Sequence, residues 1–194
     1  RSAVASVRAR LGLPARYLLH VGRVQPRKNL VRLIDAFARA RAARPELADV
    51  QLFLAGDAGW LDQEIWRAAE TSPAKDAIRM AGYVAETDLP GLIAGADALV
   101  LVGLWEGFGI PAIEAMRCST PVLAANAGAL PEVTGDAAVL VDPYDVEGIA
   151  AGLVQILEDA ALRDRLAERG PHQAARYTWE RAAACLAEAA RRLA

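Results

Sequence analysis

Two acidic residues flank a glycine-rich segment in the second half of the chain, and together they could recognise a phosphorylated sugar ligand. Glu106 and Glu114 are separated by seven residues, among them Gly107 and Gly109, which let backbone N–H groups approach a ligand closely. A helix predicted to begin at residue 110, with Pro111 in its first turn, would present its N-terminus to an anion such as a diphosphate. Carboxylates accept hydrogen bonds from sugar and ribose hydroxyls. The structural alternative makes Glu114 a favourable charge near a helix N-terminus and Glu106 an exposed loop acid.

A second segment, Gly22 to Asn29, offers cations for the same chemistry. It reads GRVQPRKN, and its first glycine follows a short apolar run. Arg23 could clamp a diphosphate through its planar guanidinium, and Lys28 could do so as a compact point charge. The segment is neither the Gly-x-Gly-x-x-Gly turn of dinucleotide sites nor a P-loop. A basic surface turn is the structural alternative.

Short apolar runs alternate with helical stretches, which is typical of a parallel sheet covered by helices on both faces. Six runs predict strands at 17–21, 51–55, 77–81, 98–102, 121–125 and 137–141. Helices are predicted at about 29–44, 61–71, 87–95, 110–117 and 145–158, with Asn29, Asp62, Thr87 and Asp145 as capping residues. We therefore expect an α/β fold with one Rossmann-like, doubly wound, six-stranded parallel sheet. Ligands bind such sheets outside the carboxyl ends of the strands, where both segments are placed.

Both ends of the chain are predicted to be helical. Beyond Asp159 the pattern is helical only, and the last helix, 178–194, has one apolar face, formed by Trp179, Ala182, Ala183, Leu186, Ala190 and Leu193. The chain starts at Arg1 rather than Met, inside a pattern typical of the end of a helix. We therefore expect a piece of a longer enzyme.

Composition favours one globular α/β domain. Of 194 residues, 54% are hydrophobic and 24% charged, which excludes disordered and disulfide-scaffold classes. The two cysteines and two histidines lack the spacing of a zinc site. With no apolar run of bilayer length and no signal-peptide core, we expect a cytoplasmic location. Peripheral association of the full enzyme with the inner membrane face is left open.

The net charge of −2 hides a basic first third. The first 45 residues hold eleven Arg or Lys and one acid, Asp35. Such a region could attract nucleic acid, an anionic membrane surface or a phosphorylated ligand. For the arginines predicted on helix 29–44 we favour a solvated helix face, with Asp35 and Arg39 as an i,i+4 pair.

The motifs resemble those of the GT4 family of retaining glycosyltransferases. The resemblance begins at Glu106 to Glu114 and covers nearly the whole chain. Further matching segments are Leu18–Arg23 with Arg27–Asn29, Ala55–Asp57 with Gly59–Trp60, Gly82–Val84 with Asp88–Leu89, Glu114–Met116, Thr120–Val122 and Leu130–Val133. The resemblance implies a GT-B enzyme of two Rossmann-like domains. This chain, 1–194, would be its C-terminal, donor-binding domain, with the terminal helix returning toward an acceptor-binding domain that the sequence lacks.

The resemblance also assigns roles to residues. Arg23 and Lys28, with Gly22, would bind the donor diphosphate, and Glu114 the ribose hydroxyls. Glu106 and the backbone of Gly107, Phe108, Gly109 and Ile110 would contact the transferred sugar, and the main chain of Val84 would meet the base. We expect Glu106, Arg23 and Lys28 to carry catalysis. The implied donor is a nucleotide sugar, no metal is expected, and the leaving diphosphate would accept the acceptor's proton. Without its acceptor domain the chain would be inactive.

Some positions depart from the family pattern beside the donor pocket. Val102-Gly103 replaces the usual Pro-Ser, and Ser119 replaces a glycine. The segment Asn126–Ala129 lacks the more polar or doubled-glycine sequences that are common at this place in the family. These differences affect the expected shape of the pocket rather than its existence. Glu132 matches the family but is interpreted as structural.

The identity of the donor depends on Glu86. Its carboxylate could accept hydrogen bonds from the N1–H and N2–H edge of guanine, which uracil cannot offer, although it could equally be a helix N-terminal acid. The segment 56–61 also resembles bacterial mannosyltransferases of surface-polysaccharide assembly. GDP-mannose is therefore our first choice and a UDP-hexose the second. The alternatives of other classes are a nucleotide-sugar epimerase and a non-catalytic module that binds through the basic first third; we do not expect a nucleic-acid partner.

Overall fold

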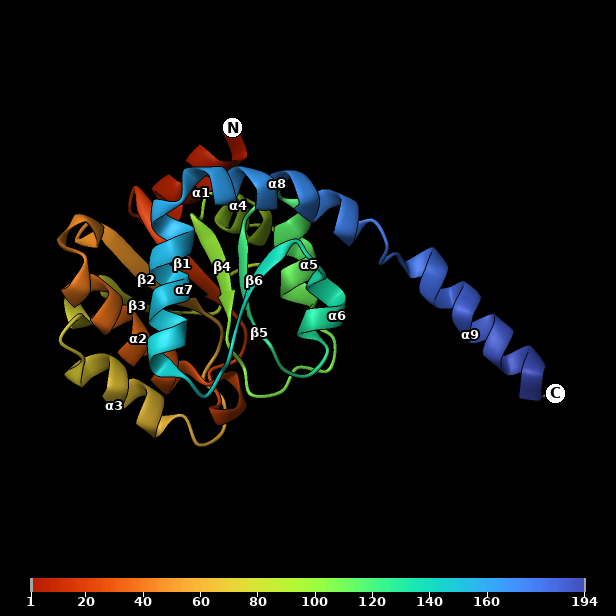
Figure 1. The fold of residues 1–194 in the computed structure, drawn as a ribbon, viewed down its shortest axis with the longest axis horizontal. Coiled ribbons are helices and arrows are strands. Elements are labelled where there is room, and N and C mark those ends of the chain that lie inside the picture. The colour runs from red at the N-terminus through yellow and green to blue at the C-terminus, as the bar shows by residue number, and fades with distance from the viewer. Residues whose placement is uncertain (1, 194) are drawn as a thin grey trace.

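The computed structural model describes residues 2–193, which form one six-stranded sheet with helices on both faces (Figure 1). Arg1 and Ala194, the predicted limits of the domain, lie outside the described residues. The strands are β1 (Arg16–Val21), β2 (Val50–Ala55), β3 (Ile78–Gly82), β4 (Ala98–Leu101), β5 (Val122–Ala125) and β6 (Ala138–Val141). They lie in the order β3-β2-β1-β4-β5-β6, and all neighbours are parallel. The prediction of a doubly wound parallel sheet of six strands is confirmed.

The helices divide between the two faces of the sheet. One face packs against α2 (Leu30–Ala43), α3 (Gln63–Thr71) and α7 (Val146–Glu158). The other packs against α1 (Ser2–Leu11), α4 (Leu89–Ala94), α5 (Ile110–Arg117) and α6 (Leu130–Thr134), and α8 (Ala160–Ala174) lies against both α5 and α7. The five helices predicted between strands are confirmed, whereas the short α6 was not predicted.

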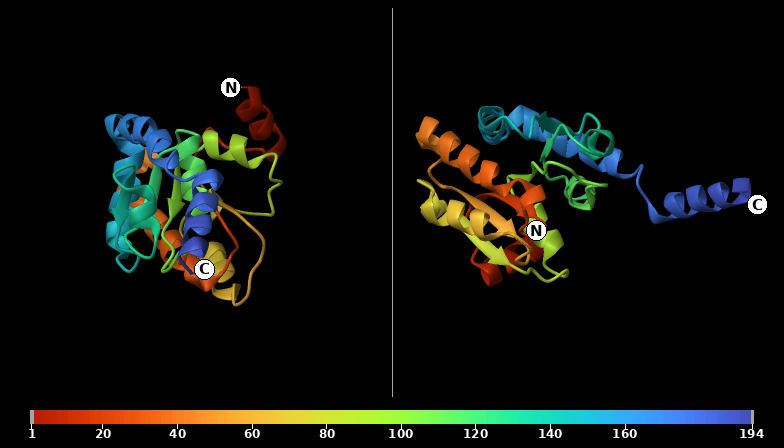
Figure 2. Two further views of the ribbon diagram at one scale, coloured as in Figure 1. Left: turned by 90° about the vertical axis from the view of Figure 1, so that its right-hand side faces the viewer. Right: turned by 90° about the horizontal axis from the view of Figure 1, so that it is seen from below.

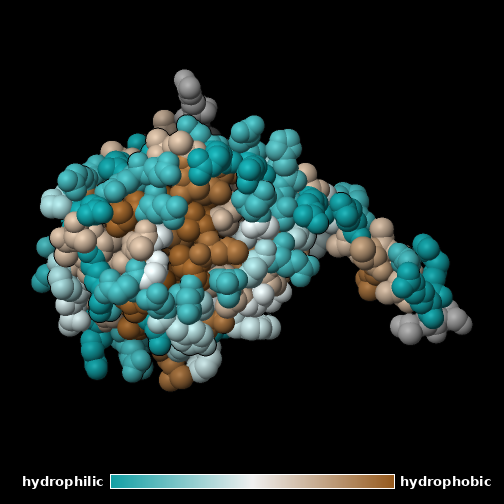
Figure 3. All heavy atoms as spheres, in the orientation of Figure 1, coloured by the Kyte–Doolittle hydropathy of each residue, from teal (hydrophilic) through white to brown (hydrophobic). Residues whose placement is uncertain are grey.

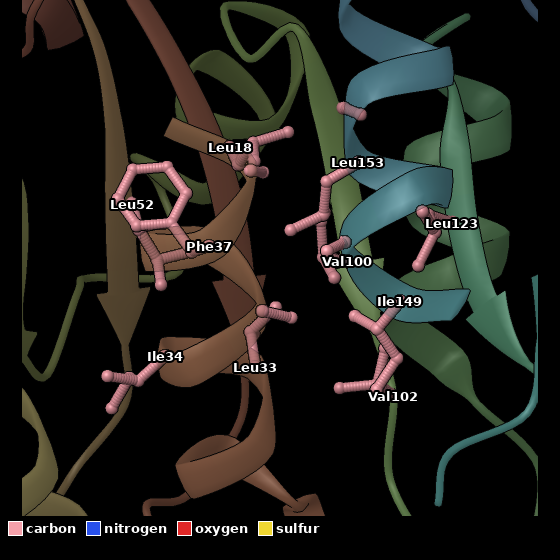
Figure 4. Close-up of a cluster of buried hydrophobic side chains, with 14 of the residues drawn as sticks. Leu18, Leu33, Ile34, Phe37, Leu52, Val100, Val102, Leu123, Ile149 and Leu153 are labelled. Carbon is pink, nitrogen blue, oxygen red and sulfur yellow. The ribbon is translucent and has the colours of Figure 1, made fainter. Parts of the chain in front are cut away.

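Side chains alternate along each inner strand, because successive residues of a strand point to opposite faces. Leu18 of β1 joins the cluster under α2 and α7, where Leu33 and Leu153 point toward the sheet (Figure 4). Tyr17 and Leu19, its chain neighbours, join the cluster on the other face. Since both faces are covered, the strands are continuous apolar runs rather than alternating ones.

The direction of the chain reverses between β1 and β4. From β1 the chain proceeds outward to β2 and β3, and from β4 it proceeds the other way to β5 and β6. The loops after β1 and β4 therefore leave toward opposite faces of the sheet, at the carboxyl ends of the strands, where sheets of this kind bind ligands. Both segments singled out for their chemistry belong to these two loops.

The predicted capping residues occupy helix starts without acting as caps. Asn29, Asp62 and Asp145 directly precede helices, and Asp88 rather than Thr87 precedes α4, but none of the four donates or accepts a side-chain capping bond. Tertiary contacts hold some of these side chains instead: Asp88, for example, pairs with Arg10. Among the helices described, α8 does have a side-chain cap, since Asp159 accepts a bond of 2.8 Å from the N–H of Leu162.

The last helix, α9 (Trp179–Leu193), extends away from the rest of the molecule (Figures 1 and 2). Its apolar side chains are in solvent: Trp179 is 84% exposed and Leu186 is 74% exposed. The predicted apolar face is thus uncovered, and its predicted range of 178–194 includes Ala194, outside the described residues. The visible face of the body is mostly polar, with an apolar strip through its middle (Figure 3). No helix within residues 2–193 is long and apolar enough to cross a membrane.

Candidate functional site

A buried ion pair joins the loops after β1 and β4 at the reversal point of the sheet. Lys28 ends a short 3₁₀ helix, η1 (Pro26–Lys28), and its Nζ donates to Oε1 of Glu106 over 2.7 Å. Each of the two side chains is only 9% exposed. Two residues far apart in the sequence, both predicted to belong to the site, are therefore in direct contact.

Arg27 is a second cation on the same carboxylate. Its Nη1 donates to Oε2 of Glu106 over 3.1 Å and to the carbonyl of Trp105 over 3.2 Å. The carbonyl of Arg27 in turn accepts from the N–H of Leu104 over 2.8 Å, so the two loops are also joined through the backbone. Arg27 was not among the predicted site residues. Its position directly before Lys28 is the signal that could have identified it.

Arg23 is exposed, and it differs from its two neighbouring cations because it is not held by Glu106. Among the residues that the structure describes, its side chain makes no hydrogen bond or ion pair. It directly follows Gly22, whose φ of +151° is rarely adopted by residues with a side chain. The loop thus presents one unpaired cation to solvent and keeps Lys28 paired and buried.

Gly103 makes room for the paired carboxylate. A Cβ at this position would lie 2.8 Å from Oε1 of Glu106 and 3.2 Å from the carbonyl oxygen of Arg27. Gly103 is one of the positions that depart from the family pattern, where a serine is usual. The departure therefore has a physical consequence: Glu106 can lie against the backbone while it pairs with Lys28.

The segment after Glu106 leads into the N-terminus of α5. Gly109 directly precedes the helix, with a φ of +86°, and Pro111 lies in the first turn as predicted. Gly107 is exposed, as are Phe108 and Ile110, which are 46% and 51% exposed. No side chain caps this terminus, Pro111 has no N–H, and the N–H of Ala112 donates to the carbonyl of Gly109 over 2.9 Å. Among the described residues, the N–H groups of Gly107 to Ile110 make no hydrogen bond and are available to an anion.

Glu114 lies one turn further along α5, in different surroundings from Glu106. It is half-buried and lines a groove of about 590 Å³ together with Phe108, Ile113 and Tyr177. Glu106 does not line this groove. This differs from the prediction that both carboxylates face one pocket, and the reason is that Glu106 turns toward Lys28 and Arg27.

Glu86 lies near Glu114. Burial raises the pKa of Glu114, and the negative charge of Glu86 raises it further. Glu86 is exposed on the loop after β3, whereas Val84 on the same loop is buried. The structure thus brings together the two residues predicted to contact the ribose and the base, although their roles stay predictions.

Asn29 ties three loops together, a role that the sequence did not reveal. Its Nδ2 donates to the carbonyl of Val102 over 3.0 Å and to that of Pro143 over 2.6 Å. These carbonyls belong to the loops after β4 and β6. The side chain predicted to cap α2 instead links the loops that follow β1, β4 and β6.

The arginines of α2, and Arg44 directly after it, are engaged within the molecule rather than gathered into a binding surface. Arg39 pairs with Asp35 over 2.9 Å, as predicted, and also with Glu147 of α7. Arg44 pairs with Glu158 over 3.4 Å. Arg32 donates to Asn29, and Arg41 to the carbonyl of Val50. Arg39 and Arg44 are exposed, as the predicted solvated face requires, whereas Arg32 and Arg41 are half-buried. Within residues 2–193, no group of three or more His, Cys, Asp or Glu side chains could hold a metal ion.

Comparisons with known proteins agree with this architecture. The family model for glycosyl transferases group 1 matches residues 7–173. O-antigen chain mannosyltransferase B of Escherichia coli is 39% identical over 168 residues, covering 84% of this chain and 42% of that relative. The chain thus spans less than half the length of this curated relative.

Solved structures show the same fold. Anabaena HepE in complex with UDP and glucose is 27% identical with a TM-score of 0.79, covering 90% of this chain and 48% of that one. The C-terminal domain of a glycosyl transferase group 1 family protein (LpcC) from Francisella tularensis is 25% identical with a TM-score of 0.72. That match covers 87% of this chain and 89% of the Francisella domain. The chain therefore belongs to the group 1 glycosyl transferases, and its fold is that of the C-terminal domain of the GT-B enzymes.

Proposed function

We propose that this chain is the donor-binding half of a retaining glycosyltransferase that takes a sugar from a nucleoside diphosphate, with GDP-mannose the favoured donor. The sugar would pass to an acceptor hydroxyl in polysaccharide or glycolipid assembly. One observation carries the proposal. At the reversal point of the sheet, Lys28 and the exposed Arg23 lie on the loop beside the one that leads into the uncapped N-terminus of α5. Cations and free helix N–H groups together suit a diphosphate.

Transfer from such a donor leaves negative charge on the departing diphosphate. Arg23 and Lys28 would stabilise that charge as it develops, which lowers the barrier without a side-chain base. Lys28 is paired with Glu106 at 2.7 Å and both side chains are buried, so a phosphate would compete with this carboxylate for the ammonium group. Glu106 would then be released to accept hydrogen bonds from the sugar. The acceptor would be held by a second domain.

The preference for guanine and mannose has two supports. Glu86 is exposed beside Glu114, where its carboxylate could accept both N–H groups of a guanine edge. The relative at 39% identity is named a mannosyltransferase. A UDP-hexose is the second candidate, and the structural neighbour in complex with UDP and glucose favours it.

Calorimetry with the purified chain tests the proposal. GDP is expected to bind, guanosine to bind much more weakly, and UDP to bind less tightly than GDP. Arg23→Ala should weaken GDP binding by about tenfold or more, since a lost hydrogen bond to a charged group costs about 1.5 to 3 kcal/mol.

Arg165→Ala is the matched control, because Arg165 is an exposed arginine of α8 away from these loops. The proposal fails if the folded chain binds neither diphosphate, or if Arg23→Ala and Arg165→Ala bind GDP equally well. Tighter binding of UDP than of GDP would reject the guanine preference alone.

A further inference from the structure

A histidine lies under the cation loop, where the sequence of β1 is otherwise apolar. His20 is 1% exposed, and its Nδ1 lies 3.0 Å from the carbonyl oxygen of Val100 on the neighbouring strand β4. A carbonyl only accepts, so Nδ1 carries the proton of this hydrogen bond. Nε2, the other ring nitrogen, is buried and has no hydrogen-bond partner among the described residues.

The ring is neutral at physiological pH. Burial lowers the pKa of His20 to about 4, and the charge of Lys28 lowers it too, against the opposing effects of the Val100 bond and of Glu106. With its proton on Nδ1, the neutral ring leaves Nε2 as a bare acceptor. Buried acceptors almost always have a donor, so this one calls for an explanation.

The bare acceptor and Lys28 border the same small space. A Cβ built on Gly22 would lie 3.4 Å from Nε2 of His20 and 3.4 Å from Nζ of Lys28. Since residue 22 is a glycine, no side chain separates the two nitrogens. Lys28 has three N–H donors and uses one on Glu106, so it has donors left for a second acceptor.

We propose that His20 is a positioning residue for Lys28. Its Nε2 accepts a hydrogen bond from one water in the space beside Gly22, and that water accepts one from the ammonium group. Glu106 and His20 are then two acceptors of different kinds. When a diphosphate draws Lys28 away from Glu106, the neutral imidazole still holds the ammonium group and adds no negative charge that would repel the phosphates. The ligand part of this inference rests on the proposed function; the contact between His20 and Lys28 does not.

The first test needs no ligand. In ¹⁵N-histidine NMR spectra, Nδ1 should be protonated and Nε2 should resonate as an unprotonated nitrogen that accepts a hydrogen bond. Lys28→Met should shift the Nε2 resonance, whereas the control Lys75→Met, at an exposed residue far along the chain, should not. An Nε2 resonance that is the same in both variants overturns the inference. This test uses the native histidine, so it does not depend on whether His20 variants fold.

The second test separates the two ring nitrogens with three variants. His20→Asn can keep a donor for Val100 but cannot reach Lys28, His20→Gln can keep an acceptor for Lys28, and His20→Phe keeps the bulk alone. Inorganic pyrophosphate is the probe, measured by calorimetry. His20→Gln should bind it within about twofold of the native chain, while Asn and Phe should lose about tenfold, as expected for a bond to a charged group.

Combination with Lys28→Met completes the test. In that background, His20→Phe should have little further effect on pyrophosphate binding or on the midpoint of urea unfolding. A purely structural histidine would give equal losses in all three variants and the same loss with or without Lys28, and that result overturns the inference. If the native chain binds no pyrophosphate although Nε2 responds to Lys28, the proposed function fails and the positioning contact stands.

Discussion

Removal of the charge of Glu106 should lower the free energy of unfolding and yet increase the affinity for a diphosphate. The change is Glu106→Gln, which preserves the size of the side chain and one acceptor oxygen. In the native chain the carboxylate is held by Lys28 at 2.7 Å and by Arg27 at 3.1 Å. The two expected effects have opposite signs because the same ion pair stabilises the fold and occupies the cation that the ligand needs.

The size of the stability loss follows from burial. Removing one partner of a buried ion pair costs about 3 to 5 kcal/mol, because the other charge is left without compensation. Gln retains an acceptor for Lys28, and the side chain of Arg27 is 44% exposed and loses little. We therefore expect the lower end of the range, about 3 kcal/mol, which a domain of ordinary stability survives. Lys28→Met should cost less, about 1 to 2 kcal/mol, since Glu106 keeps Arg27.

The gain in affinity follows from the same contact. On the proposed function GDP competes with Glu106 for the buried Lys28, and a carboxylate next to the phosphates also repels them. If Glu106→Gln removes about 1.4 kcal/mol of this competition, GDP should bind about tenfold more tightly. A role of Glu106 restricted to the sugar, as the family resemblance alone implies, predicts no change with GDP.

Urea unfolding, monitored by circular dichroism, measures the loss of stability. Calorimetry with GDP measures the gain in affinity. Glu168→Gln is the matched control, because Glu168 is an exposed acid of α8. A Glu106→Gln variant as stable as this control would mean that the pair is absent in solution. A variant that is destabilised but binds GDP no more tightly would refute the competition between Glu106 and the ligand.

Further outcomes are expected from other variants and conditions. Glu114→Gln should weaken the binding of GDP and of GDP-mannose alike, and a loss confined to the sugar-bearing ligand would contradict the ribose role of Glu114. Glu86→Ala should narrow the preference for GDP over UDP. Calorimetry measures both effects. Burial lowers the pKa of His20 from 6.5 to about 4. Between these two pH values the imidazole is protonated in the unfolded chain but not in the folded one. The free energy of unfolding should therefore fall by up to about 3 kcal/mol as the pH drops from 6.5 to 4. Urea unfolding at several pH values should show this slope in the native chain and a flatter one in His20→Phe. The chain alone should bind GDP yet transfer no sugar, and transfer of labelled mannose by this chain would show that it binds the acceptor itself. Truncation before α9 should leave the midpoint of urea unfolding unchanged, since Trp179 and Leu186 contribute little buried area.

The fold was predictable because its elements are short and strongly patterned. Strands buried on both faces are continuous apolar runs, and residues such as Leu99 and Leu123 show this without any knowledge of their neighbours in the sheet. The family resemblance then implied that these strands form a Rossmann-like sheet. Asn29 and Asp88 show where such reasoning stops: both lie at the start of a helix, yet their side chains serve distant partners. Capping is a local rule, and tertiary contacts overrule it.

The sequence suggests the residues of a candidate site but not how those residues pair. The spacing of Arg23, Lys28, Glu106 and Glu114 indicates a donor site, but no spacing reveals that Glu106 turns toward Lys28 and away from Glu114. That contact depends on the adjacency of β1 and β4, 78 residues apart at the paired side chains. Arg27 and His20 were missed for the same reason. Each is unremarkable in the sequence and gains a function only from what the sheet places beside it.

The pairing also sets an order in which the proposed ligand would meet the site. Of the three cations on the loop after β1, only Arg23 is free among the described residues, since Arg27 and Lys28 share Glu106. A diphosphate would therefore meet Arg23 first, then compete for Lys28, and only then would Glu106 be released for the sugar. A free hexose carries no charge with which to separate Lys28 from Glu106. On the proposed function, the ion pair thus makes sugar binding conditional on the diphosphate, which favours the intact donor over free sugar without any steric selection.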